Sequence, residues 1–242
     1  MCIRDSDNTK EEFDYIVAAD GVYSRTKEIL FKKEGTPKYF NSIALRGNIQ
    51  NFENSDISLY LGSNFHFVIY PINQNNEFNF ISIVRKKLVG SEITNRSLFK
   101  DKIFINNLMS QISSKSDLNL SELVNEIKCF PIFVSKKIKI PNNKNIFLMG
   151  DAFFSFPPSF AQGASQSIES ANDLFNDLNN NLSNYYKKRV LKTKQINYRS
   201  SINHHAFHIA NPINVFFRNI FLKYLSKNKS FLENYLGKIY KN

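Results

Sequence analysis

Two short apolar segments, each closed by an aspartate beside a glycine, constrain the fold of this chain most strongly. "DYIVAADG" begins at residue 14 and ends in Asp20 and Gly21, and "NIFLMGDA" begins at residue 145 and contains Gly150 and Asp151. Neither run alternates apolar with polar residues, which is typical of strands buried on both faces of a parallel sheet. A helical pattern follows each turn, so the two segments predict one α/β layer.

The stretch between these segments has a different character. "SIALRGNI", "ISLYLG", "FHFVIYPI" and "FNFISIVRKK" are β-rich and are separated by Asn, Ser and Gly, which predicts a mostly antiparallel sheet. One strand alternates clearly, with Phe65, Phe67 and Ile69 against His66, Val68 and Tyr70. Helical patterns follow at 98–112 and 120–127, and a further strand is predicted within 130–140. Together these patterns predict an α/β layer that is interrupted by a second domain.

The net charge of +11 is concentrated in the last quarter of the chain. Residues 185–242 contain 12 lysines and arginines and a single acid, Glu233, whereas the preceding residues balance. This excess indicates either a solvated basic surface or a weak contact with an anionic membrane surface. No nucleic-acid-binding motif is present, so we expect no nucleic acid partner.

Several classes of protein are disfavoured by composition. No run of about 18 apolar residues predicts a transmembrane helix, and the first residues do not form a signal peptide. Two cysteines, Cys2 and Cys129, do not make a disulfide framework. We therefore expect a cytoplasmic location.

The two turns lie where ligands bind in open α/β sheets, beyond the carboxyl ends of strands. Carboxylates there can accept hydrogen bonds from sugar hydroxyls, and glycine allows close backbone approach. After the second turn, Pro157 and Pro158 precede the small residues Ala161 to Ser165, which leave backbone N–H groups free at a helix start. This arrangement suits the electron-rich edge of a flavin ring, although an ordinary helix–sheet contact would have the same pattern.

Both motifs resemble one enzyme family. "AADGVYSRTKEILF" resembles the ADGxxSxxR segment of FAD-dependent aromatic monooxygenases, and "GDAFFSFPPSFAQGASQSIESANDL" resembles their GDAAHxxxPxxAQGxxxxIEDAxxL segment. The order and spacing match, and the strands between are similar to the salicylate hydroxylase-like branch over residues 13–240. The implied fold is α/β: an incomplete Rossmann-like FAD-binding layer (1–40 and 140–184), an antiparallel substrate domain (41–139) and a basic helical tail (185–242).

The resemblance implies a set of cofactor-binding residues. The first turn would lie near the FAD pyrophosphate, Asp151 would bind the sugar-alcohol chain, and the segment from Pro158 would cradle the isoalloxazine. The set comprises Asp20, Gly21, Gly150, Asp151, Pro158, Ala161, Gln162, Gly163 and Ala164. The implied reaction hydroxylates a small aromatic substrate through a flavin C4a-hydroperoxide, with NADH or NADPH and O2. No catalytic side chain is identified.

The chain departs from the family pattern at several positions. Phe154 replaces the histidine, Ser155 the following proline, Lys27 the arginine and Ser170 the aspartate of IEDA. The family's first strand and GxGxxG turn have no counterpart. We expect the two apolar strands to flank that absent strand, and a fragment of this kind to be inactive alone or to bind FAD weakly.

Three residues of the substrate domain are candidates for the substrate pocket: Arg46, His66 and Tyr70. Each could equally be an ordinary sheet residue. His204, His205 and His208 are spaced as metal ligands can be, but no carboxylate accompanies them, and we interpret them as a surface cluster. No metal is expected.

Two further functions stay open. A basic, apolar tail would suit a hydroxylase that acts on a lipophilic quinone precursor at a membrane surface. A non-catalytic basic binding module would explain the charge without any flavin.

Overall fold

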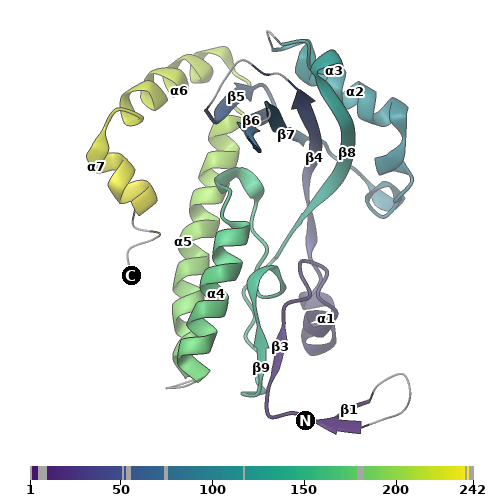
Figure 1. The fold of residues 1–242 in the computed structure, drawn as a ribbon, viewed down its shortest axis with the longest axis vertical. Coiled ribbons are helices and arrows are strands. Elements are labelled where there is room, and N and C mark those ends of the chain that lie inside the picture. Colours follow the sequence, from purple (N-terminus) through teal and green to yellow (C-terminus); the bar gives the residue numbers. More distant parts are fainter. Residues whose placement is uncertain are drawn as a thin grey trace. The chain divides into compact units, whose positions relative to one another are not determined.

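The computed structural model describes residues 2–4, 10–50, 52, 56–73, 76–116, 118–178, 183–237 and 239. The chain divides into two compact units (Figure 1). The first, the flavin-side unit, comprises Met1–Lys38 and Phe133–Ser201, and the second, the sheet unit, comprises Tyr39–Ile132 and Ile202–Asn242. The predicted three-part division, with a separate tail from residue 185, stays a prediction.

Two parallel strands form the centre of the flavin-side unit. β3 (Ile16–Ala18) pairs with β9 (Ile146–Leu148), and the Met149 N–H extends the pairing to the Ala18 oxygen at 2.9 Å. We expected these strands to flank a third strand that is absent, and this expectation is wrong. The backbones of β3 and β9 hydrogen-bond directly to each other. A small ribbon of β1 (Cys2–Arg4) and β2 (Lys10–Glu12) precedes them.

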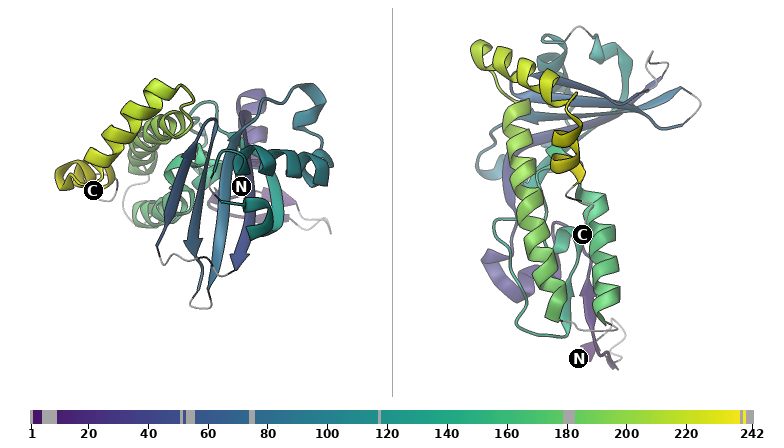
Figure 2. Two further views of the ribbon diagram at one scale, coloured as in Figure 1. Left: turned by 90° about the horizontal axis from the view of Figure 1, so that it is seen from above. Right: turned by 90° about the vertical axis from the view of Figure 1, so that its left-hand side faces the viewer.

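Helices pack around these strands. Ser24 caps α1 (Arg25–Phe31), since its side chain accepts a hydrogen bond from the Lys27 N–H. The short turns Gly150–Ala152 and Pro158–Phe160 lead into α4 (Gly163–Leu178). Beside α4 runs α5 (Ser183–Phe207), whose residues to Ser201 belong to this unit (Figures 1 and 2).

The sheet unit holds a five-stranded sheet in the order β5-β6-β7-β4-β8 (Figure 2). The strands are β4 (Lys38–Gln50), β5 (Ser58–Gly62), β6 (Phe65–Pro71), β7 (Glu77–Arg85) and β8 (Val124–Val134). The β4–β7, β5–β6 and β6–β7 pairs are antiparallel, which confirms the mostly antiparallel sheet.

One face of this sheet forms the main core with α2 (Lys102–Ser113). Short helical turns at Gly90–Ile93 and Leu98–Lys100 precede α2. Phe65, Phe67 and Ile69 pack in this core as the alternation predicts, together with Leu108 and Ile112 of the helix. Cys129 is buried in the same cluster, and burial raises the pKa of its thiol to about 12.

Two predicted elements in this unit have different bounds. The helix predicted at 120–127 ends early as α3 (Leu120–Leu123), and the strand predicted within 130–140 is β8, which begins at Val124. Gly47 explains part of this, since a Cβ there would lie 2.7 Å from the Asn125 oxygen. Because Gly47 has no side chain, the first residues of β8 can pack directly against β4.

Three short helical segments end the described chain. Asn211 caps α6 (Pro212–Leu225), and α7 (Lys229–Leu232) continues into a π-helical turn at Glu233–Gly237. Within the described residues, no helix combines the length and apolar character needed to cross a bilayer.

Candidate functional site

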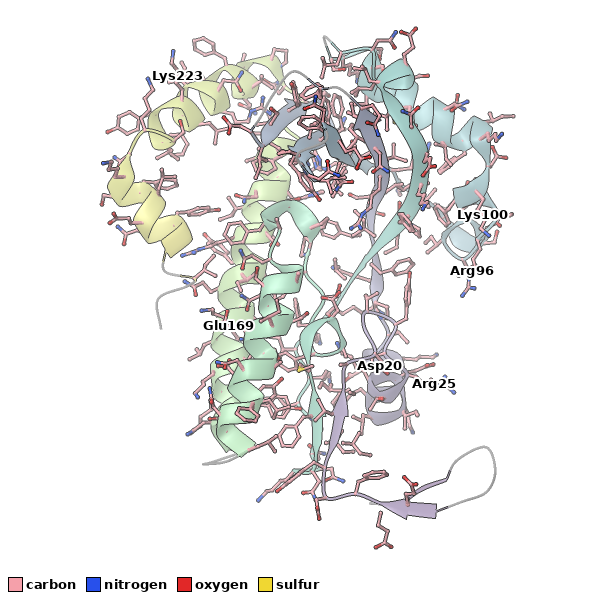
Figure 3. The ribbon with its side chains drawn as sticks, in the orientation of Figure 1. Asp20, Arg25, Arg96, Lys100, Glu169 and Lys223 are labelled. Carbon is pink, nitrogen blue, oxygen red and sulfur yellow. The ribbon has the colours of Figure 1, made fainter. Side chains whose placement is uncertain are left out.

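The first turn is built around Asp20. Its carboxylate follows β3 and accepts a hydrogen bond from the Thr26 backbone N–H at 3.1 Å, beside α1 (Figure 3). Burial works against the charged carboxylate, but hydrogen bonds from Ser24 and Thr26 outweigh it and lower the pKa of Asp20. Gly21 next to it has a φ of +76°, a left-handed conformation that favours glycine. Asp20 thus fixes the start of α1 and stays ionised.

A buried lysine joins the two turns. The Lys27 side chain, 3% exposed, donates hydrogen bonds to the Phe153 oxygen at 2.8 Å and to Ser135 Oγ at 3.1 Å. Burial lowers the pKa of Lys27 to about 8, while the charge of Asp151 opposes that shift. Position 27, where the family motif has arginine, therefore holds the loop after β9 against α1.

Asp151 stands at the carboxyl end of β9 with a free carboxylate. It has no hydrogen-bond partner among the residues that the structure describes, and it is half-buried. Burial raises the pKa of Asp151, and the nearby Lys27 charge limits that rise. A desolvated carboxylate that has a nearby charge but accepts no hydrogen bond is costly, so this position can accept hydrogen bonds from a bound molecule.

The start of α4 lies in the same loop system. Ala161 adopts a left-handed conformation, with φ 51° and ψ 32°, after a turn that its N–H closes onto the Pro158 oxygen. The N–H groups of Gly163, Ala164 and Ser165 have no acceptor in the described part of the chain, and a Cβ on Gly163 would meet no atom within 4 Å. Gln162 is buried. The helix thus presents bare N–H groups and its positive dipole end to open space.

Gly150 sets the distance between the second turn and α4. Its φ is +56°, and a Cβ there would come within 2.6 Å of Ser167 Oγ. Because the loop has no side chain at this point, it can pack directly on the first turns of α4. The Asp151 carboxylate therefore lies on a loop that is packed against the start of α4.

The three substrate-pocket candidates share one face of the sheet. In the strand register His66 lies opposite Ile83, Val68 opposite Ile81, and Tyr70 opposite Asn79, while Arg46 of β4 also pairs with Ile81. Directly paired residues point to the same side, so Arg46, His66 and Tyr70 lie on the face opposite the α2 core. Arg46 is exposed, and the Tyr70 hydroxyl accepts a hydrogen bond from Asn79.

His66 is covered by the end of α5 within the same unit. Its Nδ1 lies 2.9 Å from His208 Nε2, and His208 Nδ1 lies 3.2 Å from His204 Nε2. All three imidazoles are buried, so the interpretation of a surface cluster is wrong for His204 and His208. Only His205, on the other side of the helix, is exposed. The described residues contain no group of three or more potential ligands arranged for a metal.

The contacts of this histidine chain suit one arrangement of protons. His208 Nε2 lies 3.2 Å from the Ile83 oxygen, which can only accept, and 2.9 Å from His66 Nδ1, so a proton on Nε2 satisfies both contacts when His66 Nδ1 is unprotonated. In neutral His208 the Nδ1 atom then accepts from His204 Nε2. Burial lowers the pKa of His66 to about 4, of His204 to about 3 and of His208 to about 2, with the charge of Arg85 adding to the last two.

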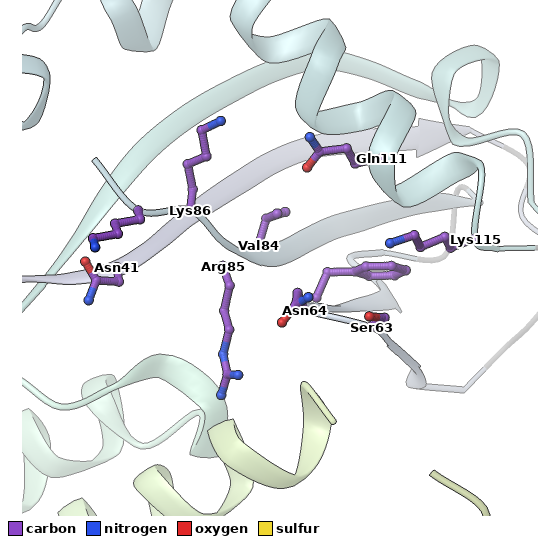
Figure 4. A pocket seen from close by; sticks show the side chains of 10 residues that line it. Asn41, Ser63, Asn64, Val84, Arg85, Lys86, Gln111 and Lys115 are labelled. Atoms are coloured by element: carbon purple, nitrogen blue, oxygen red, sulfur yellow. The ribbon is translucent and has the colours of Figure 1, made fainter. Parts of the chain in front are cut away.

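A basic cavity opens at the end of β7 in the sheet unit (Figure 4). Its volume is about 410 Å³, and Arg85, Lys86, Lys87 and Lys115 line it with Asn, Ser and Gln side chains. No acidic residue is among the described residues that line it. None of the predicted substrate-pocket residues contributes to this cavity.

A buried ion network ties α4 to α5 in the flavin-side unit. Arg189, 2% exposed, contacts Glu169 Oε1 at 3.2 Å and Asp173 Oδ2 at 3.1 Å, and its Nη2 donates to Gln166 Oε1 at 2.7 Å. Glu169 is the acid retained from the family's IEDA segment. The motif residue therefore positions the helix whose first turn faces the loop.

Comparison with known proteins decides the family. The sequence model described as "FAD binding domain" matches residues 3–202. The chain belongs to the FAD binding domain family. Its resemblance to FAD-dependent aromatic monooxygenases, predicted from the two motifs, is confirmed by the relatives described next.

A curated relative in this family is 3-amino-4-hydroxybenzoate 2-monooxygenase from Streptomyces platensis. It is 23% identical over 225 residues, covering 86% of this chain and 55% of the relative. The chain therefore spans about half the length of the curated relatives it matches.

Several solved structures of other proteins have the same fold. An HpxO variant of Klebsiella pneumoniae bound to FAD has a TM-score of 0.77 at 15% identity, covering 99% of this chain and 66% of that one. A salicylate hydroxylase substrate complex has a TM-score of 0.71 at 15% identity, covering 93% and 63%. The predicted α/β fold with its antiparallel sheet and helical end is thus confirmed.

The residues present fit the FAD that the family binds. The half-buried Asp151 carboxylate needs donors, which a sugar-alcohol chain supplies, and the N–H groups at the start of α4 need acceptors. Lys27 and Arg189 were not predicted as site residues. The sequence contains only an indirect indication of Lys27, which stands where the family motif has arginine. It contains none of Arg189, which belongs to no motif.

Proposed function

We propose that this chain forms the flavin-facing wall and the substrate sheet of an FAD-dependent monooxygenase that hydroxylates a small aromatic compound. The observation that carries the proposal is the half-buried Asp151 carboxylate, which has no hydrogen-bond partner among the described residues and lies on the loop that packs on α4, whose first N–H groups are bare. Bound FAD supplies the redox chemistry, with NADH or NADPH as reductant and O2 as oxidant.

In this proposal each part of the chain has a defined task. Asp151 accepts hydrogen bonds from the sugar-alcohol chain, and the N–H groups of Gly163 and Ala164 stabilise negative charge at the ring edge. Gly150 and Pro158 keep the loop close to α4. Asp20 and Gly21 position the first turn near the pyrophosphate.

The substrate would contact the sheet face that bears Arg46 and Tyr70. Arg46 is exposed there and can bind a carboxylate or phenolate, and Tyr70 can donate or accept a hydrogen bond. The HpxO and PqsL structures contain uric acid and 2-aminobenzoylacetate, small cyclic compounds with polar substituents. These support an aromatic substrate of similar size for this chain.

FAD titration of the folded chain, followed by flavin fluorescence and absorbance, tests the proposal. We expect saturable binding that Asp151→Asn weakens at least tenfold, because the neutral amide accepts fewer hydrogen bonds. Asp14→Asn, an exposed carboxylate in the same unit, should bind like the parent. A folded chain with no saturable FAD binding would contradict the proposal.

Turnover needs a second measurement. In a preparation that holds FAD, NAD(P)H oxidation and O2 uptake should rise when 3-amino-4-hydroxybenzoate or salicylate is added, and Arg46→Met should raise KM for these carboxylates more than it lowers kcat. Equal KM values for the parent and the variant would exclude Arg46 from substrate binding.

A further inference from the structure

Helix α6 carries apolar residues on two sides. Val215, Leu222 and Leu225 are half-buried, and the buried Arg218 donates to the Ala206 oxygen near the end of α5. The opposite side is also apolar but faces outward. A contiguous patch of large exposed apolar side chains marks a surface that contacts a partner or a membrane.

This outward side, the α6 stripe, follows a strict helical spacing. It consists of Ile213, Phe216, Phe217, Ile220, Phe221 and Tyr224, which are between 53% and 67% exposed. Intervals of three and four residues put them all in one row along a helix of 14 residues. Such a helix is about 21 Å long, which is enough to lie on a bilayer and too short to span it.

The charges around the stripe identify the partner. Lys223 lies on α6 three residues after Ile220 and projects into solvent (Figure 3). Lys227 follows α6, Lys229 begins α7, and both are exposed. Only one acid, Glu233, occurs in residues 185–242. A second copy of the chain would bring these like charges together, whereas anionic lipid headgroups neutralise them while the acyl region takes up the rings.

We propose that the α6 stripe and its flanking lysines dock this protein on an anionic phospholipid bilayer. Phe216, Phe217 and Phe221 enter the boundary between headgroups and acyl chains. The lysine stems lie along the apolar surface while their ammonium groups reach the phosphates. This contact is independent of flavin and of the aromatic substrate.

Co-flotation with vesicles tests the docking on the full 242-residue chain without added FAD. We expect binding to vesicles of 70% phosphatidylcholine and 30% phosphatidylglycerol in 100 mM NaCl, and binding at least tenfold weaker to pure phosphatidylcholine or in 500 mM NaCl. The lower salt concentration leaves most of the attraction between lysines and anionic headgroups in place, and the higher one screens it.

Two sets of variants separate ring insertion from charge. The triple variant F216S/F217S/F221S should lose at least tenfold in vesicle affinity, while I29S/I103S/L191S, equally exposed apolar residues elsewhere, should not. K223Q/K227Q/K229Q should also weaken binding, by roughly 10- to 100-fold at low salt, unlike the exposed control K100Q/K102Q/K115Q. Circular dichroism checks that each variant is folded.

Three results would overturn the proposal. The chain fails to float with anionic vesicles at low salt, or the ring variant floats as well as the parent. The third is a dimer in sedimentation experiments that persists with vesicles and that the ring variant dissolves, because the partner of the stripe would then be a second copy.

Discussion

The Nζ atom of Lys27 donates a hydrogen bond to the main-chain oxygen of Phe153 across 2.8 Å, and so links the helix after the first turn to the loop after the second. The same ammonium group bonds Ser135 Oγ and interacts with Asp151. One buried cation thereby connects three segments that are distant in the sequence.

This burial predicts how stability changes in alkaline solution. The folded pKa of Lys27 is about 8 and the unfolded value is 10.5, so between these pH values the unfolded chain binds more protons. The free energy of unfolding should therefore gain a contribution that grows as the pH rises from 8 to 10.5, on the order of 3 kcal/mol at most. Urea unfolding at pH 7.5 and 9.5 measures it.

Lys27→Met should remove this alkaline gain, whereas Lys33→Met, which alters an exposed lysine just after the same helix, should keep it. An unchanged pH dependence in Lys27→Met would show that the buried ammonium group is not its source.

The histidine chain predicts the opposite limit, a loss of stability in acid. His66, His204 and His208 have folded pKa values of about 4, 3 and 2, below the ordinary 6.5, so the unfolded chain takes up more protons as the pH falls below 6.5. Their contribution lowers the free energy of unfolding by up to about 4 kcal/mol per pH unit when all three differ. Urea midpoints from pH 7.5 to 4.5 report the slope.

In this pH series His204→Gln should reduce the slope of the free energy of unfolding against pH by the contribution of at most one bound proton. His205→Gln is the matched control, because His205 is exposed on the same helix and should leave the slope as it is. Identical slopes for the parent and both variants would mean that the buried imidazoles do not govern acid unfolding.

Gly150 and Gly90 form a matched pair for the loop geometry. Both have positive φ, +56° and +53°, but only at Gly150 would a Cβ collide, with Ser167 Oγ at 2.6 Å. Gly90→Ala should cost about 1 kcal/mol from backbone strain alone, and Gly150→Ala about 3 kcal/mol because the collision adds to it. Thermal and urea unfolding give the two values.

The double variant Gly150→Ala with Ser167→Ala should recover part of that loss, since it removes the closest atom. Additive losses in the double variant would argue against the collision as the cause.

The ion network of Arg189 should be far more sensitive than a surface pair. Arg189→Met leaves Asp173 without its buried partner and Glu169 with Lys192 in place of two cations, and should cost about 3–5 kcal/mol. Arg25→Met breaks the exposed Arg25–Glu28 pair and should cost under about 1 kcal/mol. Similar losses in the two variants, measured by urea unfolding, would contradict a stabilising role for the buried network.

Local sequence signals were sufficient for much of the fold. Ser24 marked the start of α1, and the alternation at Phe65, Phe67 and Ile69 marked the buried face of β6. The strand β8 was harder. Val124 and Cys129 are five apart, which would put them on opposite faces of a regular strand, yet both are buried. Glu126, with φ 50°, forms the irregularity that brings them to one side, and no periodicity predicts it.

The loop motifs likewise predicted a set of flavin-facing residues, which stays a prediction, but they could not predict pairings over long sequence distances. His66 and His208 are 142 residues apart, and Lys27 and Phe153 are 126 apart. Neither partner carries a local pattern that names the other. The direct pairing of β3 with β9 has the same origin, since two short apolar strands do not specify which neighbour each will take.

Cys129 gives this protein an internal reporter. Its thiol is enclosed by the apolar core between α2 and the sheet, and its high pKa keeps it unreactive while that core is closed. Labelling by a maleimide dye at this position would therefore proceed only as fast as the sheet unit opens. Dye uptake at Cys129, distinguished from uptake at Cys2 by peptide mapping, would time that opening without any engineered probe.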